Sequence, residues 1–136
     1  MKIEDLHIPC LSDKQKTKLV EAAEQTALRF CAPVYLVGSS LWNQYPNDLD
    51  IYVAVKSDSY LRMFTNYNKY SESEEDHMKN ILDMKIQQAK IYKKQKEYFE
   101  ERIRGWDFDI KFQSKEQFLQ HKEDNLRLDF VYSNLW

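Results

Sequence analysis

The chain has 136 residues, 43% hydrophobic and 14% aromatic, a composition that fits one folded domain over residues 1–136 and excludes a disordered chain. Its 20 basic and 22 acidic residues give a formal charge of −2, so bulk charge does not indicate a nucleic-acid partner. The acidic start of the sequence is unlike a secretory signal and no apolar run approaches about 18 residues, so we expect no membrane span and a cytoplasmic location.

The first regular element that we expect is an amphipathic helix preceding Pro33. Ser12 and Asp13 are both candidate N-cap residues, because their side chains can accept hydrogen bonds from the first turn. Small and apolar residues then recur every three or four positions, which predicts one buried face. They are Leu19, Ala22, Ala23, Thr26, Ala27 and Phe30. The helix should end at Ala32, since the residue before a proline disfavours helical backbone.

Two strands with a short connection are expected next. The apolar run Val34–Val37 has the length of a buried strand, and residues 39–44 should open a short helix. Pro46 and Asn47 are typical turn residues. The following segment, Asp48–Val55, has an apolar residue at every second position, which predicts a strand with one buried face.

A long helix dominates the second half of the chain. Apolar residues recur at helical spacing over residues 74–104, and Gly105 marks the end of this pattern. A shorter helix around residues 60–67 should precede it and cover the sheet. Strands are predicted at Trp106–Phe112 and Leu126–Tyr132, where the pattern alternates.

The expected order is therefore helix, strand, short helix, strand, helices, strand, helix and strand. This order predicts an α+β fold with α/β-like character, in which helices pack on one mixed sheet of about four strands. No second, substrate-binding domain is indicated.

Asp48 and Asp50 are the most informative residues of the chain, because alternate residues of a strand point to the same face. Their Cα atoms should lie about 6.6 Å apart, with Leu49 and Ile51 on the opposite face. Two carboxylates at this separation repel by about 2.5 kcal/mol at an effective dielectric near 20, which a bound cation would relieve. Oxygen ligands favour Mg²⁺. The alternative is a solvated strand face on which Asp48 only ends the preceding turn.

The acid pair belongs to a longer pattern. Gly38 and Ser39 follow an apolar strand and precede the pair by an eight-residue spacer, residues 40–47, and Asp109 lies between apolar residues in a later strand. This arrangement resembles the polymerase-β-like nucleotidyltransferase superfamily, whose pattern is glycine with glycine or serine, a spacer, acid-apolar-acid on a strand, and a third acid on another strand. The resemblance covers roughly residues 32–112 and implies the minimal nucleotidyltransferase fold.

The resemblance implies that Gly38, Ser39 and Ser40 bind the nucleotide. A glycine lets backbone N–H groups approach a triphosphate, and the start of the following helix favours anions. The Ser39 hydroxyl would donate to a phosphate oxygen. The alternative is an ordinary strand-to-helix turn in which Ser39 is an N-cap residue.

The resemblance also implies that Asp48, Asp50 and Asp109 are the catalytic residues and hold Mg²⁺, with Mn²⁺ as the alternative ion. Asp109 would help to deprotonate the attacking hydroxyl. By alternation Asp107 shares its strand face and is the rival third acid; Asp109 is preferred because it lies mid-strand between apolar neighbours. The alternative is an amphipathic edge strand with a polar outer side.

The implied activity is transfer of a nucleoside monophosphate from an NTP to a hydroxyl acceptor, with release of pyrophosphate. The acceptor could be RNA, a protein side chain or a small molecule, and its recognition should need a partner protein or a homodimer, since the chain is nearly all catalytic core. The alternative is a non-catalytic NTP-binding or partner-binding regulatory module, such as an antitoxin-like protein beside a helical HEPN partner. The intact acids argue against this module, whereas the spacer, slightly shorter than in most members, favours it.

Two other features of the sequence have less specific interpretations. Lysines along residues 74–104 would allow contact with a phosphate backbone, but interleaved glutamates favour a solvated helix face. Cys10 and Cys31 lack metal-ligand spacing and are expected as free buried thiols, which suits a reducing cytoplasm.

Overall fold

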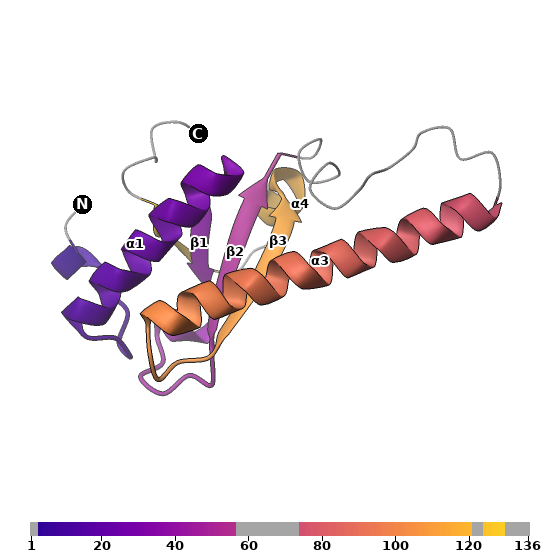
Figure 1. Cartoon of the computed structure of the whole chain (residues 1–136). Helices are drawn as coiled ribbons and strands as arrows, with labels where there is room; N and C mark the ends of the chain where they lie inside the picture. Colours follow the sequence, from indigo (N-terminus) through magenta and orange to yellow (C-terminus); the bar gives the residue numbers. More distant parts are fainter. Residues whose placement is uncertain (1–2, 57–73, 121–123, 130–136) are drawn as a thin grey trace.

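The computed structural model describes residues 3–56, 74–120 and 124–129 (Figure 1). In chain order the elements are η1 (Ile3–Asp5), α1 (Asp13–Phe30), β1 (Val34–Val37), η2 (Ser39–Leu41), β2 (Leu49–Val55), α3 (Glu74–Arg102), β3 (Phe108–Ser114), α4 (Lys115–Gln120) and β4 (Asn125–Arg127). The helix expected around residues 60–67 lies outside the described residues. Within these ranges no helix is long and apolar enough to cross a membrane.

The four strands form one mixed sheet in the order β3-β2-β1-β4. β1 runs antiparallel to its two neighbours, β2 and β4, whereas β2 and β3 are parallel. A parallel pair needs a crossover connection, and α3 lies in the chain between β2 and β3. The α+β class and the mixed sheet of four strands predicted from the sequence are therefore confirmed.

Helices α1 and α3 cover one face of the sheet, here called the helix face (Figure 1). Every second residue of β2 and β3 is buried on this face, which explains the alternation of their sequences. These residues are Leu49, Ile51, Val53, Val55, Phe108, Ile110 and Phe112. The ring of Phe99, on α3, lies 5.3 Å from that of Phe108. Burial of each large apolar side chain stabilises the fold by about 1.5–3 kcal/mol, so most of the stability arises here.

The opposite face of the sheet is covered only in part by the described helices. Phe118 of α4 is buried there and stacks on Tyr35 of β1 with ring centroids 4.3 Å apart. The same ring meets Tyr52 of β2 edge-on at 6.0 Å. These aromatic contacts form a second, smaller core with Val37 and Ala54.

Helix α1 begins with the N-cap residue Ser12 rather than Asp13. The backbone N–H of Gln15 donates to Ser12 Oγ at 3.2 Å, and the Ser12 N–H donates to Gln15 Oε1 at 2.9 Å, which completes a capping box. The helix ends at Cys31, whose φ of 50° is left-handed. Both cysteines are free, as expected, but their predicted burial is wrong: Cys10 is half-buried, and the C-cap position leaves Cys31 exposed.

The strand β1 has the predicted bounds, whereas the other strands differ by a few residues. β2 begins at Leu49, so Asp48 immediately precedes it. β3 covers Phe108–Ser114 instead of 106–112, because its parallel register with β2 starts at Phe108 and continues to Ser114. α3 ends at Arg102, two residues before its predicted end, and is followed by a turn at Gly105 with φ of 93°.

The last strand departs most from its prediction. β4 covers Asn125–Arg127, and Leu128 and Asp129 lie beyond it, within the predicted strand; the rest of that prediction, residues 130–132, lies outside the described residues. The Asp129 carboxylate accepts the backbone N–H of Val34 at 3.0 Å, the donor that a longer strand would use. At this end of β1 the Leu128 N–H still donates to the Val34 carbonyl at 2.9 Å, and the Asp129 side chain takes the place of the second backbone acceptor.

Candidate functional site

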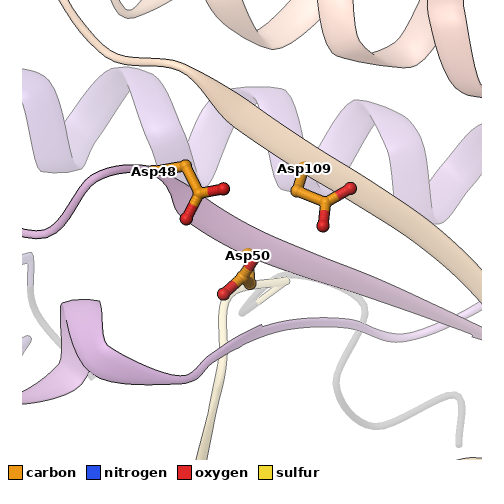
Figure 2. Close-up of side chains that lie close together, drawn as sticks. All are labelled: Asp48, Asp50 and Asp109. Carbon is orange, nitrogen blue, oxygen red and sulfur yellow. The ribbon is translucent and has the colours of Figure 1, made fainter.

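Three carboxylates meet at one end of β2 and β3 (Figure 2). Asp48, Asp50 and Asp109 each offer an oxygen atom, and these three atoms all lie within 4.8 Å of one another. All three residues are half-buried. The structure thus brings together the three acids that the sequence singles out, from segments about 60 positions apart in the chain.

The parallel pairing of β2 and β3 creates this meeting. Asp50 and Asp109 are register partners, and the preceding pair, Leu49 and Phe108, is buried on the helix face. The Leu49 N–H donates to the Asp107 carbonyl at 2.9 Å, which fixes the register where the strands begin. Alternation then directs Asp50 and Asp109 to the opposite side, here called the acid face, which also carries Tyr52 and Lys111.

Asp107 and Asp109, the two candidates for the third acid, occupy different positions relative to the carboxylate cluster. The side chain of Asp109 belongs to the carboxylate cluster, whereas Asp107 is exposed, precedes β3 and is not in the cluster. Alternation alone placed both residues on one face. Pairing with β2 separates them, because it begins only at Phe108.

Gly38 brings the predicted phosphate turn directly against this cluster. Its φ of 84° and ψ of −157° are values that L side chains rarely adopt. A Cβ atom at this position would lie 3.0 Å from Asp50 Oδ2. The preceding residue, Val37, is the register partner of Asp50, so the turn and the acid are neighbours across the sheet. Glycine is therefore required both by the backbone and by the close approach of the carboxylate.

The two serines after Gly38 form the short helix η2, as a single 3-10 turn rather than the longer helix expected. The Ser39 carbonyl accepts the backbone N–H groups of Trp42 at 3.1 Å and Asn43 at 2.7 Å. Ser39 is half-buried. Ser40 is 1% exposed, and its Oγ has no hydrogen-bond partner among the residues that the structure describes.

The cluster is electrostatically unfavourable by itself. Carboxylate oxygens within 4.8 Å repel by about 3.5 kcal/mol or more per pair at an effective dielectric near 20, and by less where water screens them. One cation already lies close: Lys111 Nζ is 3.7 Å from Asp109 Oδ2. Electrostatic interaction with Tyr52 and with the carboxylates of Asp109 and Asp50 raises the pKa of Lys111, against the opposing effect of its partial burial.

A second ion pair supports the start of β3 and was not foreseen from the sequence. Lys96 Nζ lies 2.7 Å from Glu100 Oε1 and donates to the Phe108 carbonyl at 2.9 Å. Glu100 in turn accepts the Phe108 N–H at 3.1 Å. The pair raises the pKa of Lys96 and lowers that of Glu100. The spacing of four residues is a signal that the sequence carried.

Asp129 is a buried carboxylate that sequence reasoning also missed. It is 0% exposed and is bound by Arg127, with Nε–Oδ1 and Nη2–Oδ2 distances of 3.0 Å each. Together with the Val34 N–H, this pairing satisfies a charge that burial alone would strongly penalise. Asp129 therefore joins β1 to the end of β4 and lies outside the carboxylate cluster.

Comparison with known proteins adds no family assignment. No protein-family model matches the sequence, and searches of curated proteins and of solved structures also return no match.

Proposed function

We propose that this protein is a Mg²⁺-dependent nucleotidyltransferase of the polymerase-β-like type. It would transfer a nucleoside monophosphate from an NTP to a hydroxyl acceptor and release pyrophosphate. The observation that carries the proposal is the contact between the Gly38 turn and Asp50, within a cluster completed by Asp48 and Asp109. Phosphate-binding backbone and metal-binding carboxylates are the two parts that such a reaction needs in one place.

The residues present fit a divalent cation. The cluster offers three carboxylate oxygens and no softer ligand, a donor set typical of Mg²⁺ sites. Gly38 leaves open the space beside Asp50 that a Cβ would fill. Asp48, Asp50 and Asp109 would hold the ion, which would offset the charge on the nucleotide phosphates and on the reacting oxygens.

The chain's own groups would position the reactants. Gly38 and Ser39 would present backbone N–H groups and a hydroxyl to the triphosphate. The acceptor oxygen forms a bond to the α-phosphorus while the bond from that phosphorus to the bridging oxygen of the leaving pyrophosphate breaks. The proton of the acceptor hydroxyl passes to the Asp109 carboxylate and then to water.

With two free cysteines and a cation-dependent reaction of this kind, we expect the protein to act in the cytoplasm.

A label-transfer assay tests the proposal. Purified protein is incubated with Mg²⁺, an extract of the source cell and each NTP, labelled in turn at the α- or the γ-phosphate. We expect α-label, and not γ-label, to appear in RNA, protein or a small product. Asp50→Asn should abolish the transfer, whereas the matched control Asp107→Asn, which changes an exposed acid outside the cluster, should retain it.

Two outcomes would redirect the assignment. Transfer of γ-label would indicate a kinase instead of a nucleotidyltransferase. Absence of transfer by a folded protein that still binds Mg²⁺–NTP would favour the regulatory module, which uses the same fold without turnover, and its partner could then be sought by affinity capture.

A further inference from the structure

Lys111 lies beside the carboxylate cluster and has no role in the proposed reaction so far. It is two residues beyond Asp109 on β3, so their Cα atoms are about 6.6 Å apart and their side chains share the acid face. Its register partner across the sheet is Tyr52, and Nζ lies 5.8 Å from the centre of that ring. The side chain is 50% exposed, so the ammonium group is accessible from solvent.

Two other cations in the described part of the chain, Arg127 on β4 and Lys96 on α3, are already held by strong partners. Four register partners form a row across the sheet, from Arg127 on β4 through Tyr35 and Tyr52 to Lys111 on β3. Arg127 is thus at the opposite edge of the sheet from Lys111. Its guanidinium is bound at two points by buried Asp129. Lys96 is bound by Glu100 at 2.7 Å and by the Phe108 carbonyl.

The pairing of Lys111 is different in kind. Its ion-pair partner in the described part of the chain is Asp109, which is itself a candidate metal ligand. The distance of 3.7 Å exceeds the roughly 2.7–2.9 Å of a hydrogen-bonded ion pair, so the contact is loose. A cation that binds Asp109 would compete with the ammonium for the same carboxylate, and Lys111 would then be free to turn toward an anion.

We propose that Lys111 has two alternate partners: it neutralises Asp109 in the metal-free site, and it binds the triphosphate of the nucleotide when Asp109 holds the metal. The inference rests on the proposed function. Three carboxylates and one ammonium leave the site with a charge of −2, which disfavours the approach of an anionic triphosphate. A lysine is well suited to the second task, because its ammonium is a compact charge on a flexible stem.

The two roles predict effects of opposite sign when Lys111 is replaced. For Lys111→Met, Mn²⁺ alone should bind at least about threefold more tightly, since a competing positive charge is removed. A non-hydrolysable NTP analogue, added with saturating Mn²⁺, should bind about tenfold more weakly, since a charge-assisted hydrogen bond is lost. Calorimetric titration of the full chain measures both affinities.

Two further variants serve as controls. Lys115→Met removes an exposed lysine four positions along the chain, beyond the end of β3, and should change neither affinity. Lys111→Arg keeps the positive charge and should recover most of the affinity for the analogue. A merely structural role of Lys111 would not reverse sign between the metal and the analogue.

The possible failures are distinguishable. If the wild type binds the analogue and Lys111→Met binds it equally well, or loses metal and analogue affinity together, the role of Lys111 is overturned while the proposed function stands. If the wild type binds neither Mn²⁺ nor the analogue, both the proposed function and the role of Lys111 are overturned.

Discussion

The two faces of the sheet are built from the same strands but carry opposite kinds of residue. On the helix face, β2 and β3 present apolar side chains over most of their length, and those of Leu49 and Phe108 are 0% and 1% exposed. On the acid face, the next residues along the same strands are Asp50 and Asp109, both half-buried. The helix face therefore holds the larger core, whereas the acid face gathers mutually repelling carboxylates beside the smaller core around Phe118.

Because alternate residues of one strand point to opposite faces, the same strands can place residues for stability on one face and candidate site residues on the other. A substitution on the helix face should change the free energy of unfolding, whereas replacement of a clustered carboxylate on the acid face should change binding and transfer with the fold retained. Substitutions at named positions on the two faces test this separation.

Phe108→Ala tests the helix face. The ring is fully buried against Phe99, so its removal leaves a cavity and should lower the free energy of unfolding by about 3–5 kcal/mol. Leu119→Ala, at a side chain that is 68% exposed, is the matched control and should change it by less than about 0.5 kcal/mol. Urea unfolding followed by circular dichroism measures both. A small effect of Phe108→Ala would show that the helix face does not carry the stability.

Asp109→Asn tests the acid face. It should lower the rate of label transfer by at least about 100-fold, the usual cost of losing one group that stabilises charge at the reaction centre. The melting temperature should be unchanged or higher, because one of three mutually repelling carboxylates is removed. A variant that melts well below the wild type would contradict the separation of the two faces.

Gly38→Ala should lower both stability and binding, because it combines backbone strain with a clash at the carboxylate cluster. The positive φ should cost about 1–3 kcal/mol of stability, and the Cβ would meet Asp50 Oδ2 at 3.0 Å. Gly105→Ala has a similar φ of 93°, yet its Cβ would have nothing within 4 Å. Both variants should therefore lose stability in chemical denaturation. Only Gly38→Ala should also weaken Mn²⁺ binding; equal binding by the two variants would exclude a role for this turn.

The Lys96–Glu100 pair should produce the smallest effect, because both side chains are partly exposed. The pKa of Glu100 is lowered in the folded state, so its stabilising contribution is present above its unfolded pKa of about 4.3 and is lost as the pH falls through the folded pKa. Wild type and Glu100→Gln should thus differ by less than about 1 kcal/mol at neutral pH and converge in acid. Unfolding free energies measured across this pH range would contradict the assignment if the difference persisted in acid.

Much of the fold could be predicted from local sequence patterns. The alternation of β2 and β3, the spacing of apolar residues in α1 and the capping signal at Ser12 each depend on residues a few positions apart. These patterns were sufficient to predict the α+β class and the bounds of β1, and the family resemblance pointed to the three acids that the structure brings together. Whether these acids bind a metal stays a prediction.

The remaining features depend on the register between strands that are distant in the sequence. Asp109 and Asp107 share a face by alternation, and the sequence favours Asp109 only by its apolar neighbours; the pairing of Phe108 with Leu49 separates the two in the structure. The end of β4 depends on Asp129, whose partner Val34 is 95 positions away. The contact of Gly38 with Asp50 likewise follows from the pairing of β1 with β2. Such contacts have no signature in a short stretch of sequence.

The most direct test of the carboxylate cluster is thermal unfolding in increasing Mn²⁺ for the wild type, Asp50→Asn and Asp107→Asn. A ligand at about 100 times its Kd stabilises the folded state by about 2.7 kcal/mol, which raises the melting temperature by several degrees. We predict this rise for the wild type and for Asp107→Asn, and no rise for Asp50→Asn. A wild-type melting temperature that is independent of Mn²⁺, or an equal rise in Asp50→Asn, would contradict the metal site.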